Sequence, residues 1–279
     1  GIRTIPVVLG FAADMKEVCP NAWFINYTNP MAIITGALIK GSKVKTVGLC
    51  HSVQLCVKSL FDSVGMDLEG RNIKSLIAGI NHMAWLLSIN ENGKDLYPEI
   101  KEKATEINEE ARSDYEKHEN MVRLEMMLNF GYYVTESSEH LAEYFPYWIK
   151  SQYPELIKEF NIPLDEYPRR CERQIKEWGQ MRNDIVNEKS ISHSMSHEYC
   201  SRIINAMITD EAFEFGGNVL NDGFISNLPS ESVVEIPCLA NSAGIHGTII
   251  GKLPEQCAAL NRTNINVQLL VLKAYFERD

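Results

Sequence analysis

Two residues with metal-binding side chains follow short apolar segments of this chain. Cys50 comes directly after the segment 46–49, and His82 lies two residues after the segment 76–80. In an open parallel sheet, ligands bind outside the carboxyl ends of the strands, so two such strands can bring a thiolate and an imidazole to one ion. A lone buried cysteine is more often a small core residue, and a lone histidine is more often a hydrogen-bonded polar residue. A metal site at Cys50 and His82 is therefore a hypothesis that needs support from the rest of the chain.

Composition narrows the class of protein. The chain has 279 residues, of which 45% are hydrophobic and 23% are charged, which is typical of a globular protein with one large or two small domains. Its formal net charge of −10 argues against nucleic acid as a partner, since phosphates attract clustered Lys and Arg. No apolar run approaches the roughly 18 residues needed to cross a bilayer, so we expect no membrane partner.

The cysteines indicate a compartment. Seven cysteines are scattered along the chain, and none forms a Cys-x-x-Cys pair. Free thiols of this kind are typical of a reducing environment. We therefore expect a cytoplasmic protein.

The apolar spacing predicts two domains. Up to Met83, short apolar strands alternate with helices, which is typical of βαβ units and a parallel sheet. The predicted helices are 3–18, 29–39 and 53–64, and the predicted strands are 22–26, 44–49 and 73–80. From Ala84 onward, antiparallel strands and longer helices are expected. The fold class is therefore α/β, with a partial Rossmann-like sheet of the lactate/malate dehydrogenase type over 1–83, followed by an α+β domain for substrate and oligomer contacts over 84–279.

Several longer motifs follow one another along the chain. They are Asn-Tyr-Thr-Asn-Pro (26–30), Gly-Tyr-Tyr-Val-Thr-Glu-Ser-Ser-Glu-His (131–140), Ser-His-Glu-Tyr-Cys-Ser-Arg-Ile-Ile (196–204), Gly-Asn-Val (217–219), Asn-Leu-Pro (227–229), Val-Glu-Ile-Pro-Cys (234–238) and the segment 259–268. With these motifs the chain resembles the NAD- and manganese-dependent family 4 glycoside hydrolases. It is most similar to their α-galactosidase branch.

The resemblance implies an unusual hydrolytic route, because this family does not use the common pair of carboxylates. Bound NAD⁺ takes a hydride from C3 of the sugar, and the resulting ketone acidifies the proton on C2. A base removes that proton, the glycosidic oxygen on C1 is expelled, and water then adds as the steps reverse. The implied cofactors are NAD and Mn²⁺ or another divalent cation, which stabilises the developing negative charge.

The resemblance also implies roles for single residues. Cys50 and His82 would bind the metal, with substrate oxygens and water as further ligands, although Mn²⁺ prefers harder oxygen donors. Asn29 would bind a sugar hydroxyl, with capping of the following helix as its alternative role. His51 would protonate the leaving group or support the metal ligands from behind. Asn81 would orient His82 or contact the substrate, with a simple turn role as its alternative.

The base at C2 is a tyrosine in this family, and both Tyr132 and Tyr133 lie in the matching segment. Side chains alternate along an extended strand, so we expect only one of them to face the sugar and prefer Tyr132. The polar run 135–140 is expected to surround the site or contact the sugar, with an exposed loop as the alternative. His197 and Glu198 are expected either to face the cleft or to cap a helix.

None of these motifs is the glycine-rich turn that binds a dinucleotide. A dinucleotide-binding domain opens with a strand and a Gly-x-Gly-x-x-Gly turn that holds the pyrophosphate, and in the resembling family this turn lies at the extreme N-terminus. The chain has no such turn. We therefore expect a fragment that lacks the first half of its nucleotide domain and a few C-terminal residues, and that is inactive alone.

Hydrolysis of α-galactosides is the leading functional hypothesis, with a small sugar as substrate and, by resemblance, a homodimer or homotetramer as the assembly. An α-galacturonidase or α-glucosidase of the same family is the close alternative. A lactate/malate-type dehydrogenase is more distant, and it would need a catalytic His–Asp pair and no metal. A sugar-binding protein without catalysis is the third class.

Overall fold

The computed structural model describes residues 1–113, 117–187 and 198–277. The N-terminal third alternates helices and strands as the apolar spacing predicts. Its elements are α1 (Ile5–Val18), β1 (Trp23–Asn26), α2 (Met31–Ser42), β2 (Lys45–Gly48), α3 (Ser52–Ser63) and β3 (Ile73–Ile80).

The rest of the chain mixes longer helices with antiparallel strands. In order they are β4 (Met83–Glu91), β5 (Lys94–Asp95), α4 (Tyr97–Ser113), α5 (Met121–Phe130), β6 (Tyr133–Val134), α6 (Ser138–Tyr144), α7 (Glu155–Glu159), α8 (Glu166–Asn187), α9 (Cys200–Thr209), β7 (Phe213–Leu220), β8 (Val233–Asn241), β9 (Gly244–Gly247) and α10 (Glu255–Glu277). The helix α9 begins at Cys200, and Ser196 and His197 lie outside the described residues.

The described strands form one nine-stranded sheet with the order β1-β2-β7-β8-β3-β4-β5, in which β6 pairs with β4 and β9 with β8. The α/β class with a Rossmann-like parallel pair is confirmed. The expectation that β3 lies beside β2 and parallel to it is wrong. Only β1 and β2 run parallel, because β7 and β8 lie between β2 and β3 and pair antiparallel with them. The first four residues of β8 are all buried, as expected of a strand covered on both faces at the centre of a sheet. Strands from both predicted domains therefore share this sheet.

Four residues pair across the centre of the sheet in a single row. Gly48 of β2 pairs with Asn218 of β7, Asn218 pairs with Glu235 of β8, and Glu235 pairs with Gly79 of β3. Gly48 and Gly79 both lie at the carboxyl ends of their strands. The two ends therefore converge, as the sequence suggested, but through two intervening strands instead of parallel neighbours.

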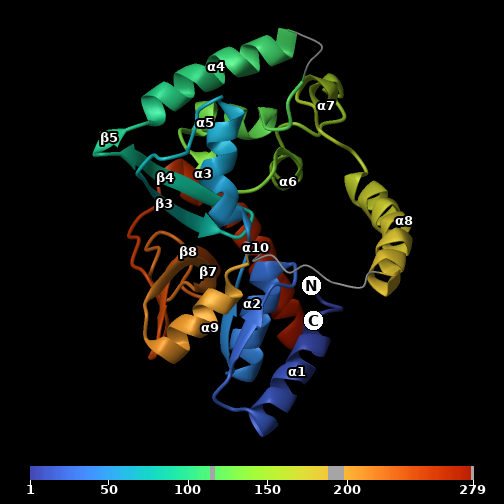
Figure 1. Cartoon of the computed structure of the whole chain (residues 1–279), viewed down its shortest axis with the longest axis vertical. Coiled ribbons are helices and arrows are strands. Elements are labelled where there is room, and N and C mark those ends of the chain that lie inside the picture. The colour runs from blue at the N-terminus through green and yellow to red at the C-terminus, as the bar shows by residue number, and fades with distance from the viewer. Residues whose placement is uncertain (114–116, 188–197, 278–279) are drawn as a thin grey trace.

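Helices cover the sheet at several places (Figure 1). The helices α1, α2 and α10 pack together near the two termini, whereas α4 lies at the opposite end of the molecule. The helix α8 projects from the side of the molecule, and none of its residues is buried. Among the described residues, no helix combines the length and the apolarity that crossing a bilayer requires.

Candidate active site

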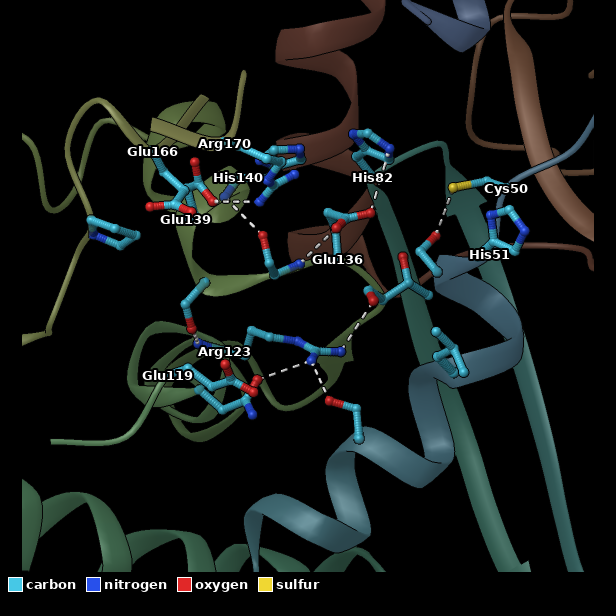
Figure 2. A pocket seen from close by; sticks show the side chains of 18 of the residues that line it. Cys50, His51, His82, Glu119, Arg123, Glu136, Glu139, His140, Glu166 and Arg170 are labelled. Atoms are coloured by element: carbon cyan, nitrogen blue, oxygen red, sulfur yellow. Dashed lines mark hydrogen bonds and ion pairs between the residues drawn. The ribbon is translucent and has the colours of Figure 1, made fainter. Parts of the chain in front are cut away.

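A cavity of about 750 Å³ opens beside the convergence of β2 and β3. Its lining comes from the start of α3, the turn between β3 and β4, the segment 135–140 and the first turn of α8. Figure 2 shows Cys50, His51, His82 and Glu136 at one end, and Glu139, Glu166 and Arg170 at the other. The ring centroid of His140 lies 5.1 Å from that of His82, so His140 lies beside the first group. Segments that are distant in sequence therefore build a single polar pocket.

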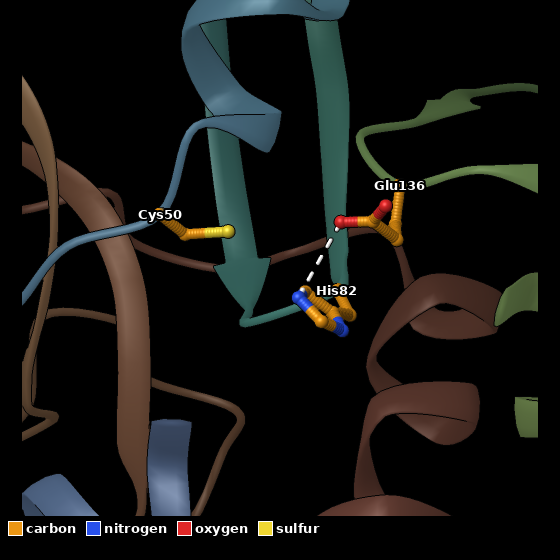
Figure 3. Close-up of side chains that lie close together, drawn as sticks. All are labelled: Cys50, His82 and Glu136. Carbon is orange, nitrogen blue, oxygen red and sulfur yellow. Dashed lines mark ion pairs between the residues drawn. The ribbon is translucent and has the colours of Figure 1, made fainter. Parts of the chain in front are cut away.

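Three of the lining side chains form a candidate metal centre. Cys50, His82 and Glu136 each offer one ligand atom, and these atoms lie within 4.8 Å of one another. Figure 3 shows the thiol and the carboxylate on either side of the imidazole, whose Nε2 is 3.4 Å from Oε2 of Glu136. Sulfur, nitrogen and oxygen donors so arranged fit a divalent cation. The carboxylate adds the hard oxygen donor that Mn²⁺ prefers.

The position of Cys50 follows from the end of β2. Its thiol lies 3.3 Å from the hydroxyl of Ser52, the first residue of α3. Its backbone carbonyl accepts a hydrogen bond of 3.0 Å from the hydroxyl of Tyr199. The cysteine is thus held by its backbone, and its side chain is left to face the pocket.

His82 lies in the tight turn that joins β3 to β4. Its φ of 62° is in the left-handed region, which His adopts more readily than most residues with side chains. The next residue is fixed by α10, because the side chain of Asn261 donates a hydrogen bond of 2.7 Å to the carbonyl of Met83. The same asparagine accepts a bond of 2.9 Å from the indole of Trp85. This buried clamp sets the direction in which His82 points.

Glu136 is positioned by a buried arginine. Arg123 of α5 donates from its guanidinium to the carbonyls of Val134 and Thr135, at distances of 2.9 to 3.1 Å. It also donates to the hydroxyl of Ser59 at 2.7 Å. The arginine is 4% exposed, so these bonds hold in a region with little water. They fix the backbone directly before Glu136.

His51 lines the same pocket and has a defined set of neighbours. Its Nε2 lies 2.7 Å from Oε1 of Glu198, and its ring stacks on Tyr27 with centroids 5.6 Å apart. The ring of Tyr199 meets it edge-on at 6.3 Å. Glu198 thus contacts a residue that lines the pocket, and its expected place at the cleft stays a prediction. The other residue of that prediction, His197, lies outside the described residues.

The two expected substrate-binding asparagines have different surroundings. Asn29 lines the pocket, and its Oδ1 also accepts a hydrogen bond of 3.2 Å from the backbone of Met31 at the start of α2. Both of its expected roles are therefore compatible with its position. Asn81 is 4% exposed and is not among the residues that line the pocket. Substrate contact by Asn81 stays a prediction, and its burial favours the alternative role of orienting His82.

The structure brings neither expected tyrosine into the pocket. Strand alternation does separate them, but Tyr133 enters a core beside α3 and α4, where burial raises its pKa to about 12. Tyr132 packs edge-on against Tyr97 and lines a different cavity with Lys101. Tyr132 as the base stays a prediction, and its place in another cavity does not favour it. The strand β6 lies along β4, and the segment that follows it reaches the pocket only from Thr135 onward.

Sequence reasoning missed two residues at the metal centre. Glu136 was grouped with a polar run around the site, because only the fold shows that its carboxylate meets Cys50 and His82. Tyr144 of α6 was not considered, yet its ring centroid lies 6.2 Å from that of His82. Burial raises the pKa of Tyr144, and the negative charge of Glu136 adds to this shift. The available signal was the spacing from the N-cap Ser137 to Tyr144, because seven residues are about two helical turns and return a side chain to the same face.

A buried acid lies directly under the centre. Glu235 in the central row of the sheet is 0% exposed. Burial raises its pKa to about 8, and the nearby Cys50 adds to the shift. Its Oε1 accepts a hydrogen bond of 2.8 Å from the amide of Asn218.

Comparisons with known proteins agree with one another. A model of family 4 glycosyl hydrolases matches residues 1–66, and a model of the C-terminal domain of that family matches residues 77–279. An α-galactosidase of Bacillus subtilis (strain 168) is 59% identical over 277 residues, which are 99% of this chain and 62% of that protein. An α-galactosidase of Rhizobium meliloti (strain 1021) is 32% identical over 100% of this chain and 57% of its own length.

Solved structures show the same fold. A 6-phospho-α-glucosidase from gut microorganisms, solved in complex with NAD and Mn²⁺, superimposes with a TM-score of 0.74 at 20% identity. The match covers 100% of this chain and 64% of that structure. The chain thus spans about three fifths of the length of the curated α-galactosidases it matches.

Proposed function

Since this chain belongs to the family 4 glycosyl hydrolases, we propose that it acts in the hydrolysis of α-galactosides with NAD⁺ and a divalent metal ion, Mn²⁺ first among them. The observation that carries this proposal is the cluster of Cys50, His82 and Glu136 at one end of a polar pocket. The identity of 59% to an α-galactosidase supports the choice of sugar. The alternative of a lactate/malate-type dehydrogenase needs no metal, so it does not explain this cluster.

The bound cofactors would supply a hydride acceptor and a Lewis acid for oxidation at C3 and elimination across C2 and C1. Cys50, His82 and Glu136 would hold the metal ion. Asn29, in the lining of the same pocket, would bind a sugar hydroxyl. His51 would hold the proton for the glycosidic oxygen, while Glu198 keeps its imidazole oriented from 2.7 Å. The metal site and the acid would therefore be adjacent in sequence and in space.

Tyr144 is the tyrosine that we propose as the base at C2, in place of Tyr132. Tyr144→Phe is expected to slow turnover about 10²–10⁴-fold, the usual contribution of a positioned base, and to leave Mn²⁺ binding intact. Tyr132→Phe is the matched control and is expected to be nearly silent, because Tyr132 lines another cavity. Steady-state rates and the isotope effect for substrate deuterated at C2 check this. A large effect from Tyr132→Phe alone would restore the assignment made from sequence.

The pocket favours a neutral sugar over a uronic acid or a sugar phosphate. A substrate carboxylate or phosphate needs an arginine or lysine partner. Of the two arginines in the lining, Arg123 is engaged by backbone carbonyls and Arg170 lies 3.9 Å from Glu139. Four glutamates line the cavity as well, namely Glu119, Glu136, Glu139 and Glu166. The lining of the pocket therefore favours an α-galactosidase over an α-galacturonidase.

The test is an assay of the protein that carries this chain, on nitrophenyl α-galactoside, α-glucoside and α-galacturonide. Activity is expected on the α-galactoside, and only when both NAD⁺ and Mn²⁺ are supplied. Chelation of the metal is expected to remove it, and Mn²⁺ to restore it. Turnover that persists without NAD⁺ or after chelation would refute the redox route. Preference for the galacturonide would refute the choice of substrate alone.

We propose further that the protein is a cytoplasmic homo-oligomer that uses α8 as an interface. All seven cysteines are free, as in reducing compartments. On α8, Tyr167, Ile175 and Trp178 are 71%, 75% and 59% exposed, and such an apolar face is characteristic of an interaction surface.

A charge on that face is expected to break the assembly. Trp178→Glu should lower the molecular mass measured by light scattering toward that of one chain. Asn183→Glu adds the same charge on another side of the same helix and should leave the mass unchanged. A wild-type protein that is already monomeric would contradict the proposal.

A further inference from the structure

The carboxyl group of Glu235 lies buried at the centre of the sheet. The residue is 0% exposed, and among the described residues no Lys, Arg or His forms an ion pair with it. A carboxylate removed from water is unfavourable unless a cation or a full set of hydrogen bonds compensates it. Such a residue in the interior therefore requires a physical reason.

Its hydrogen bonds are only partly satisfied. Oε1 accepts from Asn218 at 2.8 Å, but Oε2 has no hydrogen-bond partner among the described residues. The amide nitrogen of Asn81 is also buried and has no hydrogen-bond partner among the described residues. Asn81 nevertheless lies close enough to Glu235 to lower the pKa of its carboxyl group. Both asparagines thus present N–H groups toward an acceptor, which suits an ionised carboxylate.

The position of Glu235 connects it to both strands that carry metal ligands. Asn218, which holds it, also donates to the carbonyl of Gly48 at 3.4 Å, two residues before Cys50. On the other side, Glu235 pairs with Gly79 of β3. Asn81 lies two residues after Gly79 and directly before His82. Cys50 and His82 both interact with Glu235 electrostatically. The cation expected nearest to this carboxyl group is therefore the metal ion itself.

We propose that Glu235 is a positioning residue of the metal centre: its buried carboxylate balances the charge of the ion from beneath Cys50 and His82, and it orients His82 through Asn81. This inference rests on the metal site of the proposed function. Residues that hold metal ligands from behind typically change metal affinity 10- to 100-fold when replaced. Because Glu235 is not itself one of the three clustered ligands, its replacement leaves the donor set complete.

Glu235→Gln tests the role of the charge, since glutamine keeps the shape of the side chain. We expect binding of Mn²⁺ alone, measured by calorimetry, to weaken about 10- to 100-fold. With Co²⁺ as the probe, the absorption band from the Cys50 thiolate should persist once the site is saturated, since the ligands are unchanged. Stability of the metal-free chain should stay equal or rise, because an uncompensated buried acid is removed. A residue needed only for folding would instead lower that stability.

Two further variants complete the test. Glu235→Asp keeps the charge and should bind Mn²⁺ more tightly than Glu235→Gln, which separates charge from shape even if one variant folds poorly. Glu214→Gln, an exposed glutamate on the neighbouring strand β7, is the matched control and should bind like wild type. Wild-type affinity in Glu235→Gln would overturn the inference. Failure of the wild-type chain to bind Mn²⁺ or Co²⁺ would overturn the metal site of the proposed function instead.

Discussion

Replacement of Cys50 by serine is expected to abolish metal binding and glycosidase activity while leaving the fold intact. A neutral hydroxyl is a much poorer ligand than a thiolate, so the loss of Mn²⁺ affinity should exceed the roughly 100-fold seen for residues behind the ligands. The fold should persist because the contact of residue 50 with Tyr199 uses the backbone carbonyl, which serine retains. Metal content and turnover would be measured on the same preparation, with circular dichroism as the check on folding.

Cys171→Ser is the matched control. Cys171 lies on α8, is also only partly buried, and is not part of the metal cluster. It should bind Mn²⁺ and turn over substrate like the wild-type protein. Full metal occupancy with unchanged turnover in Cys50→Ser would show that Cys50 is not a ligand.

Replacement of Arg123 by methionine is expected to have the largest effect on stability. The variant keeps the apolar part of the side chain but leaves the buried carbonyls of Val134 and Thr135 without their donors. Each buried acceptor left unpaired costs about 1–3 kcal/mol, so for two carbonyls we expect the free energy of unfolding to fall by about 2–6 kcal/mol. Mn²⁺ affinity should fall as well, because the backbone before Glu136 is no longer held.

Urea unfolding of the metal-free chain measures the first effect, and calorimetry with Mn²⁺ measures the second. Lys58→Met removes one positive charge from an exposed pair with Asp62 on α3. That control should change the free energy of unfolding by less than about 1 kcal/mol, as is usual for surface ion pairs. Equal stability losses in both variants would show that the buried hydrogen bonds of Arg123 are not what holds this segment.

The local pattern of residues was enough to find the two strand ends beside which the candidate metal cluster lies. Cys50 and His82 stand out because each follows a short apolar run, and strand ends are determined largely by nearby residues. The motif matches added the family, the redox route and the pairing of these two residues in one site. The same local logic predicted α2, α3 and β3 closely, since helix starts and apolar spacing depend on neighbours in the chain.

Only the tertiary structure decided which residues surround the candidate metal centre. Glu136 joins Cys50 because Arg123, 13 residues earlier in the chain, holds its backbone from another helix. The insertion of β7 and β8 between β2 and β3 places Glu235 beneath the centre, and no local pattern encodes pairing between strands about 150 residues apart. The tyrosines show the same limit: alternation separated Tyr132 from Tyr133, but the pairing of β6 with β4 directed both away from the pocket. Strand pairing and buried hydrogen bonds depend on distant parts of the chain, so they determine the site only once the whole sheet has formed.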